Sequence, residues 1–249
     1  MNEQDLGWLQ LRLPVCTVNL EPIATVRGEG WRIRTPDGDY AFIRRTCAPW
    51  LTPQFEVAAQ RAAAAVGLAP ELVDCDLNER LLLMHWIDGE PADTPHLEAM
   101  AHTLASIHRL QLPDSLDVRR GVAELAQVYA DIIDQPSRCG PLLDEVHAYR
   151  EDDDWVVCHR DPTPSNFLLR QPQSTAVLLD WEYASHGDRW FDVACVLESF
   201  EWSAEEQQQF IDHYARHAGV VANAAHLRRA RMAYAAIVRL WDVAVDLVR

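Results

Sequence analysis

The stretch of residues 155–180 constrains the fold more than any other part of this chain. It contains three short apolar runs separated by polar segments, at residues 155–158, 167–169 and 176–179. Apolar runs of this length between turn residues are typical of short buried strands. A polar loop with Asp161 and Asn166 follows the first run, and Asp180 follows the third. The pattern therefore predicts three oxygen-bearing side chains at the ends of buried strands.

The spacing of these polar residues fits phosphoryl transfer. His159, Arg160, Asp161 and Asn166 form the pattern H-R-D-x-x-x-x-N. Transfer of a γ-phosphoryl group needs a carboxylate that accepts the hydroxyl proton and hard oxygen ligands that hold Mg²⁺ against the phosphates. Asp161 is the candidate base, and Asn166 and Asp180 are the candidate Mg²⁺ ligands. The alternative interpretation is an acidic turn that only caps itself through its Asp and Asn side chains.

Further residues make a resemblance to a known family specific. The sequence continues with L-L-D-W-E-Y-A at residues 178–184, Gly187-Asp188, and F-D-V-A at residues 191–194. Together with the H-R-D loop, these segments resemble the aminoglycoside phosphotransferase and choline kinase superfamily. Within it, D-W-E-Y-A is most similar to the choline, ethanolamine and thiamine kinase branch. The similarity runs from about Trp31 to the C-terminus and is strongest in the second half.

This resemblance implies an α+β, two-lobed protein-kinase-like fold that acts on a small alcohol with ATP and Mg²⁺. The expected lobes are a small β-rich N-terminal, nucleotide-binding lobe over residues 1–86 and a larger helical C-terminal lobe over residues 87–249. Two alternatives stay open. One is a kinase for an aminoglycoside or another sugar-like acceptor, and the other is a non-catalytic nucleotide-binding regulatory module.

Local patterns near the N-terminus suggest where phosphates would be covered. Residues 31–34 and 40–44 alternate in polarity around Pro36-Asp37-Gly38, which predicts a β-hairpin. Gly28 and Gly30 precede this hairpin, and glycines allow backbone amides to approach a phosphate. A plain turn explains the two glycines equally well.

The resemblance supplies the remaining expected nucleotide contacts. Arg44, at the end of the second hairpin strand, is the expected cation for the α and β phosphates. Glu56, in the first turn of a helix predicted over residues 53–66, is its expected ion-pair partner, although the helix dipole also favours an acid there. The segment 85–90 corresponds to the hinge between lobes, so backbone groups of His85 and Ile87 are expected to contact adenine.

Residues beyond Asp180 suggest a cationic acceptor. Ring faces and carboxylates bind quaternary or aromatic cations such as choline or thiamine, and the candidates are Trp181, Glu182 and Trp241. The chain has 9 tryptophans, which mostly fill protein cores, so a core role is the alternative for Trp241. For Glu182, the alternative is that it only orients the metal-binding loop.

Composition narrows the class of partner. A net charge of −16, from 38 acidic and 22 basic residues, argues against nucleic acid and against an anionic membrane surface. It mildly favours a cationic substrate, although solubility or a saline habitat explains the negative charge equally well. The 6 cysteines are dispersed and no signal peptide precedes the acidic start, which indicates reduced thiols in the cytoplasm. Neither the oligomeric state nor a function for the first twenty residues follows from the sequence.

Helical patterns fill the second half. Apolar spacing predicts helices over residues 122–133 and 142–149, separated by the proline-rich segment 136–141. By analogy with the family, Asp192 is expected to brace the catalytic loop through backbone amides. The segment 203–206 is a capping box that starts another helix.

One pair of histidines has metal-like spacing. His213 and His217 lie four residues apart on one predicted helix face. No third ligand is evident and no H-E-x-x-H is present, so the sequence argues against a zinc site there.

Overall fold

Two compact units make up the chain in the computed structural model, which describes residues 1–13, 19–23, 25, 28–170 and 175–248. Unit 1 consists of Met1–Cys47 and Pro70–Asp88, and unit 2 of Ala48–Ala69 and Gly89–Arg249. The expected division between residues 86 and 87 differs from this in two respects. The later boundary falls after Asp88, and the segment Ala48–Ala69 packs with unit 2.

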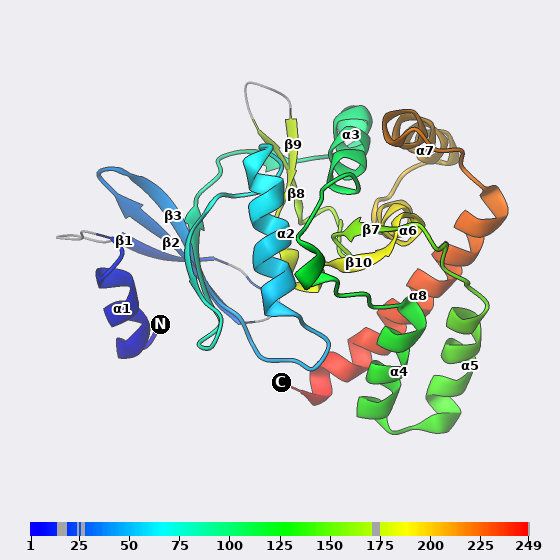
Figure 1. The fold of residues 1–249 in the computed structure, drawn as a ribbon, viewed down its shortest axis with the longest axis horizontal. Coiled ribbons are helices and arrows are strands. Elements are labelled where there is room, and N and C mark those ends of the chain that lie inside the picture. The colour runs from blue at the N-terminus through cyan, green and yellow to red at the C-terminus, as the bar shows by residue number, and fades with distance from the viewer. Residues whose placement is uncertain (14–18, 24, 26–27, 171–174, 249) are drawn as a thin grey trace. The chain divides into compact units, whose positions relative to one another are not determined.

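Unit 1 is built on a five-stranded antiparallel sheet (Figure 1). The strand order is β1-β2-β3-β5-β4, and the strands are β1 (Asn19–Ile23), β2 (Glu29–Thr35), β3 (Gly38–Arg44), β4 (Leu72–Asp76) and β5 (Leu81–His85). The predicted hairpin is confirmed, because β2 pairs with β3 from Glu29 opposite Arg44 to Thr35 opposite Gly38. Alternation along these strands places Ile33, Phe42 and Leu83 together in one buried cluster.

The N-terminal residues complete the core of unit 1. Helix α1 (Glu3–Gln10) begins with a capping box in which Asn2 and Asp5 satisfy each other's backbone N–H groups. Leu9 and Leu13 are buried in the same apolar cluster as the sheet residues. The first residues of the chain therefore have a structural role that the sequence did not indicate.

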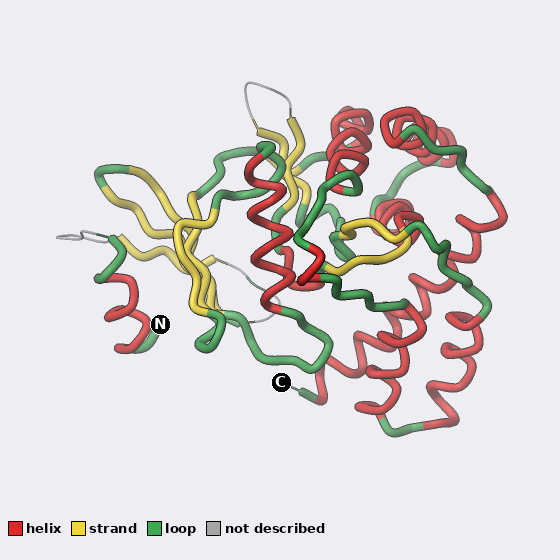
Figure 2. Tube along the Cα trace, in the orientation of Figure 1, coloured by secondary structure: helices red, strands yellow, loops and turns green. Residues whose placement is uncertain are grey.

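Helices dominate unit 2 (Figure 2). They are α2 (Pro53–Ala65), α3 (Leu97–Ile107), α4 (Val122–Ile133), α5 (Pro136–His147), α6 (Arg189–Ser199), α7 (Ala204–Ala218) and α8 (Ala224–Leu247). Helix α8 packs against α4, α5 and α6, and α3 packs against α7. The capping box of Ser203 and Glu206 at the start of α7 is confirmed. Among the described residues, no helix is both long and apolar enough to cross a bilayer.

Helix α5 contradicts the sequence prediction. The proline-rich segment was expected to separate two helices, yet α5 runs continuously from Pro136 to His147 with Pro141 inside it. Pro136 occupies the first turn, where a missing N–H costs no helical hydrogen bond. Cys139, Leu142 and Val146 form a buried face of this helix. Burial of that face outweighs the hydrogen bond lost at Pro141.

Two small sheets in unit 2 carry the polar loop of the sequence pattern. Strand β7 (Trp155–Cys158) pairs with β10 (Ser185–Asp188), while β8 (Phe167–Arg170) pairs with β9 (Thr175–Leu178) and β6 (Glu90–Pro91). The three predicted buried strands are thus confirmed as β7, β8 and β9. Short 3-10 turns complete the unit: η1 (Thr94–His96), η2 (Asp114–Leu116) and η3 (Trp181–Tyr183). One small antiparallel sheet unit and one larger helical unit confirm the expected α+β class.

The described cysteines are free thiols: Cys47, Cys75, Cys139, Cys158 and Cys195. Cys16 lies outside the described residues.

Candidate active site

The loop between β7 and β8 is closed by hydrogen bonds among its own residues. The side-chain Nδ2 of Asn166 donates to the backbone oxygen and to carboxylate Oδ2 of Asp161, each at 2.8 Å. The backbone N–H of Asn166 donates to Thr163 O at 3.0 Å, and that of Thr163 donates to Asp161 O at 2.9 Å. The five-residue spacing from Asp161 to Asn166 therefore directs the Asn166 amide onto the candidate base.

A second segment, which follows β9, is pinned to this loop. The N–H of Leu179 donates to Asn166 O at 2.9 Å, and Leu179 O accepts from His159 Nε2 at 2.9 Å. The next residue, Asp180, has φ 63° and ψ 67°, in the left-handed region where few non-glycine residues occur. This conformation turns the chain from β9 into η3. Asp161, Asn166 and Asp180 are thereby brought together in unit 2.

Negative charge accumulates at Asp161. Burial is the largest cause that raises its pKa to about 8, followed by the Asp180 carboxylate, while the Asn166 hydrogen bond acts in the opposite direction. The carboxylate of Glu182 also raises this pKa. Asp180 and Glu182 are therefore close enough to disfavour the charged form of Asp161, and a bound cation would offset this effect.

His159 is a neutral positioning residue. Its side chain is fully buried, and burial lowers its pKa. Nδ1 accepts from the Asp161 N–H at 3.3 Å, and Nε2 faces the Leu179 carbonyl oxygen, which can only accept. The proton must therefore be on Nε2. In this tautomer His159 connects the loop to the segment that carries Asp180.

Asp192 braces the loop as the sequence predicted. Its carboxylate accepts from the backbone N–H groups of His159 at 2.7 Å and Arg160 at 2.9 Å. It also lies 3.2 Å from His108 Nε2, and His108 Nδ1 lies 2.7 Å from the hydroxyl of Tyr214. All of these side chains are buried. Helix α6 thus fixes the two residues that directly precede the candidate base.

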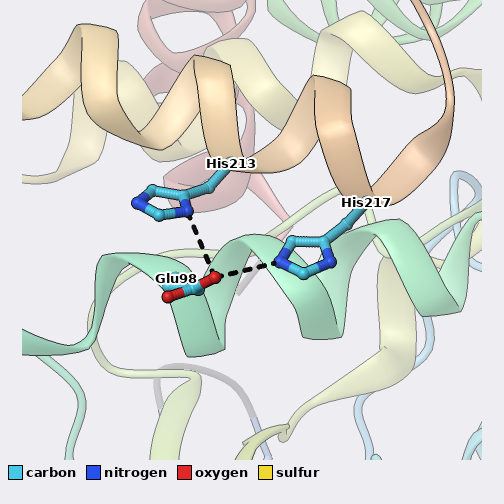
Figure 3. A group of neighbouring side chains, drawn as sticks. All are labelled: Glu98, His213 and His217. Carbon is cyan, nitrogen blue, oxygen red and sulfur yellow. Dashed lines mark ion pairs between the residues drawn. The ribbon is translucent and has the colours of Figure 1, made fainter.

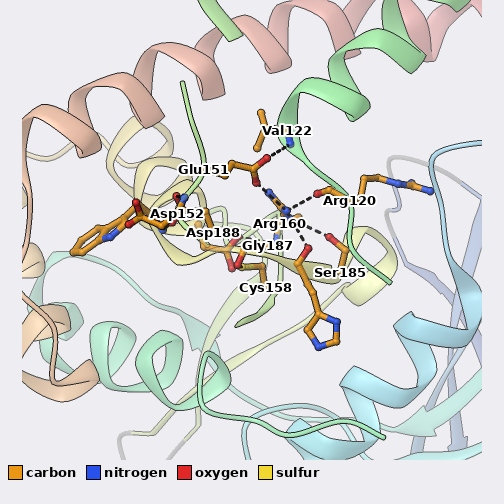
Figure 4. A network of polar contacts seen from close by, with 12 residues as sticks. Arg120, Val122, Glu151, Asp152, Cys158, Arg160, Ser185, Gly187 and Asp188 are labelled. Atoms are coloured by element: carbon orange, nitrogen blue, oxygen red, sulfur yellow. Dashed lines mark hydrogen bonds and ion pairs between the residues drawn. The ribbon is translucent and has the colours of Figure 1, made fainter. Parts of the chain in front are cut away.

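Arg160 anchors the same loop from its other side (Figure 4). Its backbone has φ 69°, and its buried guanidinium reaches several segments of unit 2. The contacts are Nη2 to Arg120 O at 2.8 Å and His186 O at 3.3 Å, Nε to Ser185 Oγ at 3.2 Å, and Nη2 to Glu151 Oε1 at 3.7 Å. Glu151 is itself held by the Val122 N–H at 2.7 Å.

The donor set fits a hard divalent ion. Asn166 makes its side-chain hydrogen bonds through Nδ2, so Oδ1 is the atom that it offers to a metal. Asp180 supplies a carboxylate from the neighbouring turn. Oxygen donors from carboxylate and amide groups are what Mg²⁺ prefers, and the repulsion around Asp161 favours a cation at this place.

The three acceptor candidates have different environments. Trp181 is 0% exposed. Its Nε1 donates to Leu178 O at 3.0 Å, and its ring packs edge-on against His159 at 4.8 Å. The ring is enclosed by the protein core in this structure, and a contact between its face and a cationic acceptor stays a prediction. Its contacts with Leu178 and His159 support the catalytic loop.

Glu182 and Trp241 remain candidates. Glu182 is buried in η3 and acts electrostatically on Asp161. The half-buried Trp241 of α8 donates from Nε1 to the Tyr183 hydroxyl at 2.9 Å. This hydrogen bond holds α8 next to the turn that carries Glu182. Trp241 must lie near that turn if it is to contribute to an acceptor site.

In unit 1, both candidate glycines have structural reasons to be glycine. Gly28 has φ +83°, and a Cβ there would lie 2.0 Å from Arg44 O. A Cβ at Gly30 would lie 2.6 Å from Ile23 Cγ1. These requirements favour the plain-turn interpretation, and a phosphate contact by either glycine stays a prediction.

Arg44 has a partner that the sequence did not suggest. Its Nε lies 3.1 Å from both carboxylate oxygens of Asp5, and its Nη2 also pairs with Asp5. Asp5 is fully buried and comes from α1, so no local spacing pointed to it. Glu56 is buried on α2 in unit 2, and its expected pairing with Arg44 stays a prediction.

The predicted hinge residues, His85 and Ile87, lie just before unit 1 ends at Asp88. His85 ends β5 and its N–H already donates to Glu71 O at 2.9 Å, so an adenine contact would have to use other backbone groups. Ile87 is half-buried, two residues before unit 2 resumes at Gly89. Nucleotide contacts by either residue stay predictions.

Together, the strand-loop-strand unit with its clustered Asp161, Asn166 and Asp180 and the α+β fold define a phosphotransferase-like protein. The chain belongs to the phosphotransferase enzyme family, whose model matches residues 22–233. The resemblance inferred from the H-R-D loop and the D-W-E-Y-A segment is thereby confirmed.

A curated protein is also similar to this chain in sequence. A LicA homologue of Mycoplasma capricolum subsp. capricolum is 24% identical over 163 residues, which cover 59% of this chain and 61% of that protein. The match thus spans about three fifths of the curated relative.

Solved structures share the fold. Choline kinase LicA from Streptococcus pneumoniae aligns with a TM-score of 0.81 at 18% identity, over 98% of this chain and 92% of that one. LicA in complex with AMP aligns with a TM-score of 0.77 at 17% identity, over 99% and 91%. An aminoglycoside-3'-phosphotransferase of type VIII aligns with a TM-score of 0.71 at 21% identity, over 94% and 98%. The expected fold is therefore confirmed.

Proposed function

We propose that this protein is an ATP- and Mg²⁺-dependent kinase that phosphorylates the hydroxyl group of a small cationic alcohol. The observation that carries the proposal is the double hydrogen bond from Asn166 to Asp161, together with the Leu179–Asn166 bond that places Asp180 beside them. Family membership supports the reaction class. The AMP complex of LicA supports nucleotide binding by this fold.

Asp161 is assigned the role of general base. As the acceptor oxygen forms its bond to the γ-phosphorus, the hydroxyl proton passes to the Asp161 carboxylate, the bond from that phosphorus to the β-phosphate oxygen breaks, and ADP leaves. Asn166 and Asp180 would hold Mg²⁺, which would neutralise phosphate charge when bound. Asn166 also orients Asp161 by donating to its Oδ2.

His159, Arg160 and Asp192 are positioning residues in this proposal. They contact backbone groups, one another and buried side chains such as Ser185, Glu151 and His108. None of them needs to touch the substrate. Because Asp192 accepts from the two amides before Asp161, a shift of α6 would be transmitted directly to the base. Rigid placement of this kind matters because catalysis depends on the geometry of the reacting atoms.

A cationic acceptor fits the charge and the aromatic residues around Asp180. The excess of 38 acidic over 22 basic residues and the carboxylate of Glu182 attract a positive group. Trp241, fixed to Tyr183, supplies an aromatic ring. Choline kinase LicA, to which this fold is similar, is a kinase of such an alcohol by name. Thiamine, choline and ethanolamine are the acceptors proposed.

An assay of ADP release with different acceptors tests this function. Purified protein is incubated with ATP, Mg²⁺ and one of thiamine, choline, ethanolamine or a kanamycin-type aminoglycoside. We expect stimulated ADP release with at least one of the three cationic alcohols. Activity confined to the aminoglycosides would contradict the proposed acceptor class, while ATP binding without stimulation by any acceptor would favour a regulatory module.

Two variants test the acceptor residues. Glu182→Gln and Trp241→Ala should raise the KM for the acceptor much more than that for ATP. A lost charge or cation–π contact of about 1–3 kcal/mol corresponds to roughly a five- to hundredfold change. Glu124→Gln, at an exposed position on α4, is the matched control. An unchanged acceptor KM in both test variants would remove these residues from the acceptor site.

A further inference from the structure

Helices α3 and α7 bring three potential metal ligands together (Figure 3). Glu98 is in the first turn of α3, and His213 and His217 lie on one face of α7. One ligand atom of each residue lies within 4.8 Å of those of the other two. We propose that Glu98, His213 and His217 form a Zn²⁺-binding site that fastens α3 to α7.

The distances fit a tetrahedral ion. Zn²⁺ binds imidazole nitrogen and carboxylate oxygen at about 2.0–2.2 Å, which places neighbouring ligand atoms roughly 3.3–3.6 Å apart. Glu98 Oε1 lies 3.5 Å from His213 Nδ1 and 3.6 Å from His217 Nε2. Three protein ligands leave a fourth position for water. Imidazole with a single carboxylate is a ligand set that suits zinc better than Mg²⁺.

The state of His217 supports a ligand role. Its Nε2 is buried and makes no hydrogen bond with the described residues, although it faces the Glu98 carboxylate. The His102 ring, on α3, packs edge-on against that of His217 at 5.0 Å. A buried imidazole nitrogen that faces a carboxylate without a hydrogen bond is positioned to bind a metal ion.

Arg216 competes with a metal at this place. Its Nη1 lies 3.9 Å from Glu98 Oε1 and 3.3 Å from His213 Nδ1. The side chain is 63% exposed, so it can move into solvent. On metal binding, the exposed Arg216 guanidinium would therefore be replaced by Zn²⁺ bonded directly to Glu98 and His213. Removing the guanidinium should strengthen Zn²⁺ binding.

The proposed site supports the scaffold behind the catalytic loop. Helix α3 ends at Ile107, and His108 follows it to contact both Tyr214 of α7 and Asp192. A metal bound between α3 and α7 would stabilise the packing that orients His108. The site itself uses none of the residues assigned to phosphoryl transfer.

Calorimetric titration tests the site directly. Protein treated with EDTA and dialysed is titrated with ZnCl₂ at neutral pH, with Mg²⁺ in excess to occupy oxygen-ligand sites. We expect one equivalent of Zn²⁺ to bind to the wild type. His213→Ala and His217→Ala should each weaken binding roughly tenfold or more, and Glu98→Gln should also weaken it. His147→Ala, an exposed histidine on α5, should bind as the wild type does.

Two further readouts separate the site from a folding effect. Zn²⁺ should raise the unfolding temperature of the wild type and of His147→Ala, but not that of a His213→Ala/His217→Ala double variant whose metal-free circular dichroism matches the wild type. Arg216→Met should bind Zn²⁺ more tightly than the wild type. Failure of the wild type to bind one equivalent, or equal affinity in the double variant, would overturn the proposal. A kinase assay without Zn²⁺ stays informative in either case, so this test is independent of the proposed reaction.

Discussion

Substitution of Gly187 by alanine should displace Arg160 and disturb the catalytic loop. Gly187 lies in β10 opposite Val156. A Cβ at this position would lie 1.8 Å from Arg160 Nη2 and 2.5 Å from its Cζ. The Arg160 guanidinium must therefore leave its place. Its side chain is only 4% exposed, so the displacement has to take place within packed protein.

The cost follows from the contacts that Arg160 would lose. These are the hydrogen bonds to Arg120 O, His186 O and Ser185 Oγ, and the ion pair with the buried Glu151. Breaking a buried charge network of this kind costs about 3–5 kcal/mol. That is a large part of the roughly 5–15 kcal/mol that stabilises a typical domain. For a chain of this size, it corresponds to a fall in Tm of roughly 6–20 °C.

Gly140→Ala is the matched control. A Cβ at Gly140 would meet nothing within 4 Å, and the residue lies inside helix α5. Alanine is a better helix former than glycine by about 1 kcal/mol. Thermal unfolding followed by circular dichroism should therefore show a neutral or slightly stabilising change for Gly140→Ala and a large loss for Gly187→Ala. Turnover of Gly187→Ala should fall more than its affinity for ATP.

A double-mutant cycle isolates the contact. In an Arg160→Met background, Gly187→Ala should cost less, because no guanidinium occupies the position of the new methyl group. A coupling free energy of about 0.5–3 kcal/mol is expected for residues in contact. Equal costs in the two backgrounds, or an unchanged Tm for Gly187→Ala, would refute the reasoning.

Three further predictions concern the residues around the base. Asp161→Asn should abolish turnover, because the proton acceptor is lost while its shape is kept; ATP affinity should stay within a few fold, and comparable activity would exclude Asp161 as the base. Asp180→Ala should remove the Mg²⁺ dependence of ATP binding in calorimetric titrations, with a milder effect for Asn166→Ala, and an unchanged dependence in Asp180→Ala would refute its role as ligand. Asp192→Asn should lower kcat more than it changes the KM for ATP. Burial alone would raise the pKa of Asp192, but its hydrogen bond and charge interaction with His108 lower it below 3.8. The Asp192 carboxylate should therefore stabilise the fold above that pH, and this stabilisation should be lost as the pH falls through the folded-state pKa. Unfolding of Asp192→Asn should accordingly depend less on pH in the acid range. Identical acid unfolding of variant and wild type would contradict this.

The sequence predicted the loop around Asp161 well because the relevant interactions are local. Asn166 reaches Asp161 across five residues, and short apolar runs on either side leave few possibilities except buried strands. The capping box at Ser203 and the hairpin around Asp37 are similarly encoded within a few residues. Family resemblance added the role of Asp192, whose two amide contacts join segments that are distant in sequence.

Helix α5 shows where local rules fail. The two prolines of segment 136–141 favour a break, but burial of Cys139, Leu142 and Val146 requires a continuous helix. Such burial is a property of the packed core, to which α4 and α8 contribute, and it cannot be read from a window of a dozen residues. Local propensity is weak beside tertiary packing.

What the sequence determined by itself was the order of strands, the polar loop between them and the chemical type of its side chains, since each of these depends on neighbours along the chain. Only the tertiary structure decided which distant groups meet. It enclosed Trp181 in the core, paired Arg44 with Asp5, and placed Glu98 beside His213 and His217. These contacts join separate elements, and their partners are selected by how apolar faces pack rather than by any spacing in the sequence.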